Sequence, residues 1–153
     1  LGNLYIEINN HNDAINSFKN SLKIKPNFHI AYYNLAVLYK SIGRFKEAIE
    51  AINKVIEIFP KFYEAYRILS QIVKYKTQDD SINNMINLYD QIDTTTLGKI
   101  SLGFAIGKAF DDLKKYKEAF FYYEKSNILR RNNISSILRK KKMNLKKLNH
   151  FLI

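Results

Sequence analysis

Apolar residues across positions 29–58 recur in steps of three and four, the period of a helix that buries one face. One such stretch ends near Ile42, and Gly43 follows it. A second stretch runs from about Lys46 to Ile58 and is followed by Pro60, a residue that a helix interior does not accommodate. The pattern predicts two amphipathic helices joined by a short turn.

The same arrangement of residue types returns along the chain at a constant offset, the one that separates Leu4 from Leu38. Self-similarity at this period, with two helical patterns and a closing proline in each unit, is typical of stacked helix–turn–helix repeats. The identical pairs are Leu4 and Leu38, Tyr5 and Tyr39, Ala14 and Ala48, Ile24 and Ile58, and Pro26 and Pro60. The sequence therefore predicts an array of such units.

Residue types at fixed places in the unit resemble the tetratricopeptide repeat family. The matching residues are an aromatic at position 4 (Tyr32, Tyr66), an aliphatic at 7 (Leu1, Leu35, Leu69, Ile106), a small residue at 8 (Gly2, Ala36, Ser70, Gly107), an aromatic at 11 (Tyr5, Tyr39, Phe110), alanine at 20 (Ala14, Ala48, Ala119) and proline at 32 (Pro26, Pro60). The resemblance implies an all-α fold, a right-handed α-solenoid of helix–turn–helix repeats. It covers about residues 1–131, in a partial unit at 1–28 and units at 29–62, 63–99 and 100–131.

The third unit is irregular, because it lacks the alanine at position 20 and the closing proline. Ala48 and Ala119 stand two units apart, but their spacing exceeds twice the offset from Leu4 to Leu38, and the excess corresponds to three inserted residues. A helix from about Asp80 to Gln91 is still predicted, with Asp79 or Ser81 as its N-cap.

Residues 63–131 show a narrower resemblance, to the last repeats of bacterial proteins in which tetratricopeptide repeats precede a sulfotransferase domain. The residues that carry it are Gly107, Lys108, Asp111, Asp112, Tyr116, Ala119, Phe120, Asn127, Arg130 and Arg131. This resemblance implies an alternative function, as the N-terminal repeat region of a two-domain sulfotransferase. The catalytic domain would lie outside these 153 residues.

The family resemblance also implies where a partner binds, since the first helices of the repeats line a concave groove that takes a peptide or a partner helix. The groove candidates are Ile30, Tyr33, Val37, Lys40, Arg67, Gln71, Lys74, Phe104 and Lys108, with Glu64, Ser101 and Asp111 at equivalent positions. We expect Tyr33 and Phe104 to act as anchors and Arg67 to supply hydrogen bonds.

Some members of the family clamp the C-terminal carboxylate of a partner with two asparagines and several basic residues. Asn3 and Asn34 occupy the matching asparagine positions, but Glu64 and Ile68 stand where this clamp needs lysine and arginine. Binding of chaperone tails is therefore not expected.

Candidate catalytic or metal-binding groups do not converge in the sequence. The chain has no cysteine and three scattered histidines, and no nucleophile, base and orienting group are placed together. The segment 103–109 differs from a phosphate loop in its glycine spacing and lacks the Ser or Thr that would bind magnesium. We expect a non-enzymatic protein-interaction module without a cofactor or metal.

The net charge of +11 is unevenly distributed. Residues 1–129 carry 17 basic and 14 acidic side chains, so the array is nearly neutral and nucleic-acid binding is not expected. Residues 130–153 hold the remaining +8, and we expect 132–153 to form a basic capping helix or a linker. An alternative is an amphipathic segment that contacts an anionic lipid or nucleic acid weakly.

Neither end of the chain carries a recognisable targeting or membrane segment. No apolar run long enough to cross a bilayer occurs, and the first residues lack the pattern of a signal peptide. We expect a cytoplasmic protein. Because Leu1 takes position 7 of a repeat, we also expect the chain to be a fragment of a longer protein.

Overall fold

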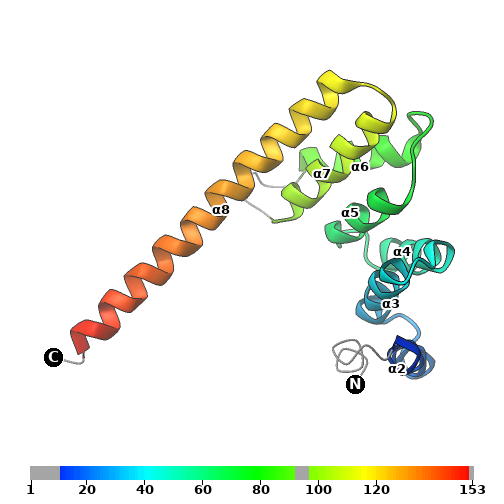
Figure 1. Cartoon of the computed structure of the whole chain (residues 1–153), viewed down its shortest axis with the longest axis horizontal. Helices are drawn as coiled ribbons and strands as arrows, with labels where there is room; N and C mark the ends of the chain where they lie inside the picture. The colour runs from blue at the N-terminus through cyan, green and yellow to red at the C-terminus, as the bar shows by residue number, and fades with distance from the viewer. Residues whose placement is uncertain (1–10, 92–96, 152–153) are drawn as a thin grey trace.

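The structure is a computed structural model that describes residues 11–91 and 97–151, with side chains to residue 144. All the regular secondary structure within these ranges is helical. The helices are α2 (His11–Ile24), α3 (His29–Ser41), α4 (Phe45–Ile58), α5 (Tyr63–Ile72), α6 (Asp80–Gln91), α7 (Leu97–Asp112) and α8 (Tyr116–Phe151). They follow one another around a curved stack, and the predicted all-α solenoid is confirmed (Figure 1).

Two helix pairs show the expected hairpin of a repeat unit, α3 with α4 and α7 with α8. The alanines at repeat position 20 of these units, Ala48 and Ala119, are both buried. A small side chain there lets the two helix backbones come close together. The helices that pack against each other in these two hairpins therefore lie where the repeat period predicts them.

The third unit, whose sequence is irregular, departs from this hairpin. Helix α5 ends at Ile72, and Val73 after it has an extended backbone. Asp79 then caps α6, since its Oδ1 accepts hydrogen bonds from the backbone N–H groups of Ser81 at 3.0 Å and Ile82 at 3.3 Å. Helix α6 packs mainly against α7, and α5 also packs directly against α7.

The buried side chains form two clusters that meet at α5. The first joins α2, α3, α4 and one side of α5, including Ala65 and Ile68. The second joins Tyr66 of α5 to α6, α7 and the start of α8. One short helix thus connects a regular N-terminal core to a C-terminal core built around the irregular unit.

Helix α8 is 36 residues long, more than twice the length of any other described helix. Its first part packs on α7, and the remainder extends past the other helices (Figure 1). No helix in the described ranges combines the length and apolar character needed to cross a bilayer.

Candidate partner-binding groove

Side chains from α3, α5 and α7 form one polar row across the stack. Lys40 Nζ of α3 donates a hydrogen bond to Gln71 Oε1 of α5. On the other side of α5, Ser101 Oγ of α7 donates to Glu64 Oε2 at 2.7 Å. Helices α3, α5 and α7, each the first helix of its unit, therefore share a continuous surface. We call this surface the groove, and the repeat positions place the candidate residues on it.

At the C-terminal end of the groove lies an open cavity of about 320 Å³. Helices α5, α7 and α8 all contribute to it. Its lining residues are Arg67, Ser70, Gln71, Phe104, Lys108, Tyr123 and Arg130. Four of the residues predicted for the groove, Arg67, Gln71, Phe104 and Lys108, thus lie around one cavity.

Two of the three cations around this cavity are held by carboxylates. Arg67 Nε donates to Glu64 Oε1 at 2.8 Å, and this hydrogen bond raises the pKa of Arg67. Lys108 Nζ lies 2.5 Å from Asp112 Oδ2, which also accepts the N–H of Tyr75 at 3.1 Å. Burial opposes ionisation of Asp112, but these hydrogen bonds outweigh it and lower the pKa of the carboxyl group.

The third cation, Arg130, is held differently. Its Cζ lies 5.6 Å from the centroid of the Phe104 ring, and among the described residues it forms no ion pair. Phe104 also lies against Tyr123, with ring centroids 6.3 Å apart. The cavity therefore has an aromatic side beneath a guanidinium whose donors can reach a further acceptor.

Tetratricopeptide repeat models match residues 2–43, 29–62 and 104–133. Together these ranges take in more than half of the chain. The match to 29–62 spans the hairpin of α3 and α4, and the match to 104–133 spans most of α7 and the first part of α8. The chain is a tetratricopeptide repeat protein. The matched ranges leave out residues 63–103, which contain the irregular unit.

Solved structures of similar shape carry the name MamA. One crystal structure of MamA is 25% identical over 88% of this chain and 77% of that chain, with a TM-score of 0.64. A second is also 25% identical, covers 88% of this chain and 72% of that chain, and has a TM-score of 0.62. A MamA RS-1 ArsTM double mutant is 20% identical over 86% and 72%, with a TM-score of 0.62, and shares the fold. No curated protein matches the chain significantly.

These findings support a protein–protein interaction scaffold, which is the broader of our functional predictions. The narrower resemblance to the repeat region of sulfotransferases is not shown by them. Three residues of that resemblance have contacts within this tetratricopeptide repeat protein: a Cβ on Gly107 would lie 2.7 Å from the Tyr123 ring, and Lys108 pairs with Asp112. Among the described residues, no three His, Cys, Asp or Glu side chains cluster as metal ligands would.

The remaining groove candidates lie outside the cavity. Tyr33 is half-buried against Phe62, with ring centroids 5.0 Å apart. Burial raises the pKa of its hydroxyl, and the nearby carboxylate of Glu64 raises it further. Ile30 and Val37 are exposed on α3.

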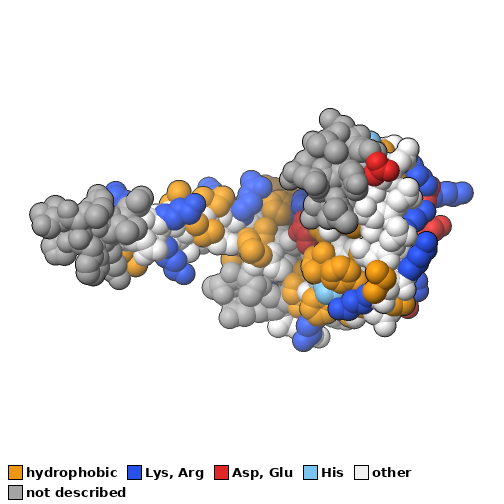
Figure 2. All heavy atoms as spheres, turned by 90° about the horizontal axis from the view of Figure 1, so that it is seen from below, with side chains coloured by type: hydrophobic (Ala, Val, Ile, Leu, Met, Phe, Trp, Pro, Cys, Tyr) orange, Lys and Arg blue, Asp and Glu red, His pale blue; other side chains and the backbone are white. Residues whose placement is uncertain are grey.

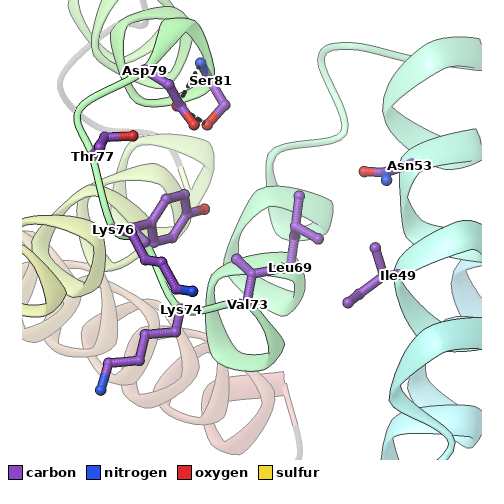
Figure 3. Close-up of a pocket in the computed structure, with 10 residues that line it drawn as sticks. Ile49, Asn53, Leu69, Val73, Lys74, Lys76, Thr77, Asp79 and Ser81 are labelled. Carbon is purple, nitrogen blue, oxygen red and sulfur yellow. Dashed lines mark hydrogen bonds between the residues drawn. The ribbon is translucent and has the colours of Figure 1, made fainter.

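The structure separates Lys74 from the other candidates. Helix α5 ends two residues before it, so Lys74 leaves the helical register on which its groove position depended. It lines a second cavity, of about 370 Å³, together with Lys76 of the same connector. Figure 3 shows the α4 side chains Ile49 and Asn53 facing Leu69 and Val73 across this cavity.

Two residues that line the cavity, Tyr123 and Arg130, are not among the candidates predicted from the sequence, and both belong to α8. Repeat positions assign the groove to first helices, whereas these residues belong to a second helix. The available signal was Gly107, whose missing side chain leaves room for the Tyr123 ring. A small residue indicates a close helix contact but not which aromatic ring fills it.

Proposed function

We propose that this protein binds a segment of a partner protein in the groove of α3, α5 and α7, and that the segment places an acidic side chain in the cavity beside Arg67, Lys108 and Arg130. The observation that carries the proposal is the aromatic-backed cavity with Arg130 at its rim. A carboxylate is the acceptor that a guanidinium binds best, because two parallel N–H groups can reach its two oxygens.

The charges around the cavity support an acidic occupant. Glu64 and Asp112 each pair with one cation of the cavity, and Arg130 is the lining cation that forms no ion pair with a described residue. Gln71, Phe104 and Tyr123 add a hydrogen-bonding group and two aromatic faces. Such a site suits a peptide in which an acidic residue stands next to an apolar one.

Selection of peptides from a displayed random library on the immobilised chain tests the proposal. We expect the selected peptides to combine Asp or Glu with an apolar neighbour. Arg130→Glu and Phe104→Ala should each weaken the binding of such a peptide about tenfold or more, the size of one lost charge-assisted contact.

Lys46→Glu provides the matched control, since it makes the same charge reversal at an exposed position of α4 outside the groove. Its affinity for the selected peptides should equal that of the unaltered chain. Peptides without acidic residues, or affinities that respond equally to Lys46→Glu and Arg130→Glu, would refute the proposal.

The alternative function, as the repeat region of a two-domain sulfotransferase, is tested on the gene. It requires coding sequence for a nucleotide-sulfate binding domain directly after residue 153. Sequencing of the flanking DNA decides it without any binding measurement.

A further inference from the structure

The side chains in the C-terminal part of α8 are exposed as far as the structure describes them. From Ile134 to Asn144 every side chain is exposed, although the helix continues without interruption. Figure 1 shows this part projecting beyond the start of α7, the helix against which the first part of α8 packs. We call residues 131–151 the distal segment of α8.

Apolar side chains follow one side of the distal segment. Ile134, Ile137 and Leu138 are 51%, 47% and 61% exposed. Their spacing of three and four residues places them within an arc of about 100° on the helix surface. In the sequence, Leu145 and Leu148 continue the same spacing. A purely solvated helix gains nothing from such a stripe, because exposed isoleucine and leucine are solvated unfavourably.

The remaining surface of the distal segment is strongly basic. Arg139, Lys140 and Lys142 lie outside the arc of the apolar stripe, and all three are exposed. Lys141 lies within the arc, where its long side chain can carry the ammonium group past the apolar residues. Residues 130–153 contain eight Lys and Arg and no Asp or Glu. Figure 2 shows basic and apolar side chains side by side along the projecting helix.

We infer that the distal segment of α8 is a docking element for an anionic lipid surface. Lying parallel to the surface, the helix would bury the stripe of Ile134, Ile137 and Leu138 at the boundary between headgroups and acyl chains. Its lysines and arginines would then reach the acidic headgroups on either side. Both the apolar stripe and the excess of positive charge are accounted for by this one occupant.

The apolar stripe and the excess of positive charge together argue against other occupants of this surface. A nucleic acid would attract the lysines and arginines but would leave the apolar stripe uncovered. A second copy of the chain could cover the stripe, but it would bring a second set of eight positive charges against the first. An acidic protein helix, in a partner or in any sequence that follows residue 153, is a further competitor, and a direct binding comparison distinguishes it.

The chain contains no tryptophan, so a single introduced tryptophan reports on one place. Ile134→Trp places the reporter on the apolar stripe, and Met143→Trp places it about 180° away, nine residues along the same helix. With vesicles of phosphatidylcholine and phosphatidylserine, we expect the Ile134→Trp emission to shift to shorter wavelength and the Met143→Trp emission to shift much less. Equal shifts, or no shift at either position, would overturn the inference.

Vesicle co-sedimentation of the full chain measures the contribution of each face. The triple variant Arg139→Gln/Lys140→Gln/Lys142→Gln should bind the phosphatidylserine vesicles about a hundredfold more weakly, since each basic residue contributes about fivefold near an anionic surface. Ile134→Asn/Leu138→Asn should weaken binding at least about tenfold. Vesicles of phosphatidylcholine alone should bind the unaltered chain poorly, and added salt should reduce binding to the anionic ones.

The matched control is Lys46→Gln/Lys54→Gln/Lys61→Gln, which removes the same charge from exposed positions outside α8 and should leave vesicle binding unchanged. Circular dichroism establishes that each variant keeps its helix content. Loss of binding in this control, or binding that survives Ile134→Asn/Leu138→Asn, would overturn the inference in favour of general attraction between polycation and polyanion. Binding of an acidic amphipathic peptide without binding of anionic vesicles would overturn it in favour of a protein partner.

Discussion

The hairpins α3–α4 and α7–α8 are the same unit built twice, with the irregular unit between them. Their turns make identical backbone hydrogen bonds: Arg44 N–H donates to Tyr39 C=O at 2.8 Å, and Lys115 N–H donates to Phe110 C=O at 2.9 Å. In each turn the side chain of the same basic residue also lies over the ring of the same aromatic residue, Arg44 over Tyr39 and Lys115 over Phe110. The turn is thus determined by a few local residue types that both units possess.

The two units differ in what fills the space between their helices. Val55 of α4 is completely buried, and the equivalent residue of α8 is Ser126, also completely buried. Opposite Ser126 stands Gly103, where the unit of α3 and α4 has Tyr32. A Cβ on Gly103 would lie 2.0 Å from Ser126 Oγ, so the hydroxyl occupies space that a side chain would need. Equivalent positions therefore tolerate different residues only in compensating pairs.

The ends of the second helices differ even more. Pro60 follows α4 closely, whereas the equivalent residue in α8 is Arg131 and the helix continues to Phe151. A proline removes a backbone donor and clashes with the carbonyl four residues before it, so it ends a helix that arginine allows to continue. The difference between Pro60 and Arg131 thus accounts for the different lengths of α4 and α8.

The largest expected effect comes from giving α8 the ending of α4. Arg131→Pro should remove helix from most of residues 131–151, since a proline inside a helix costs about 3 kcal/mol or more and this segment has almost no packing to compensate. Far-ultraviolet circular dichroism should then lose about a fifth of its helical signal, the share that the distal segment has of the described helices.

Arg131→Ala makes the same charge change without the proline and should keep the full signal. The packing of α7 against the first part of α8 should survive in both variants, because Ser126 and Tyr123 precede the substitution. A kinked but fully helical Arg131→Pro variant would show that the distal segment is stable by itself.

An intermediate effect is expected from exchanging the residue types of the two cores. Val55→Ser should lower the free energy of unfolding by about 2–3 kcal/mol, because it removes buried methyl groups and leaves a hydroxyl without a partner. Ser126→Ala should be neutral or raise it by up to about 1 kcal/mol, since no described group forms a hydrogen bond with Ser126 Oγ. Urea denaturation followed by circular dichroism measures both.

The decisive result is whether the two substitutions change the free energy of unfolding in opposite directions. If Ser126→Ala destabilises the protein as much as Val55→Ser does, the Ser126 hydroxyl contributes to stability and the two cores are more alike than their residues indicate. A double variant, Gly103→Ala/Ser126→Gly, should then be compared with Gly103→Ala alone, because removing the hydroxyl should relieve the clash if the pair is coupled.

The comparison of units also explains how far the sequence could predict this fold. The ends of α3 and α4 were predictable because Gly43 and Pro60 act locally on the backbone. The buried alanines at position 20 were predictable because they recur with the repeat. The cap of α6 by Asp79 was predictable for the same reason. That Tyr123 and Arg130 line the same cavity as residues of α5 was not predictable. It depends on how α7 and α8, which are distant from α5 in the sequence, pack beside it. The displacement of Lys74 depends on where α5 ends, which the repeat pattern places too late.

The smallest expected effect concerns one backbone angle in the two turns. Gly43 has φ +76°, and the equivalent residue Lys114 has φ +60°, a conformation that side chains disfavour. No atom would touch a Cβ on Gly43, so Gly43→Ala should cost about 1 kcal/mol through the backbone alone. Lys114→Gly should instead stabilise the protein by about 0.5 kcal/mol, because relief of the strained backbone exceeds the added entropy of the unfolded chain. Calorimetric melting should show opposite shifts, and a Lys114→Gly variant that melts as early as Gly43→Ala would mean that the Lys114 side chain stabilises a turn that its backbone angle strains.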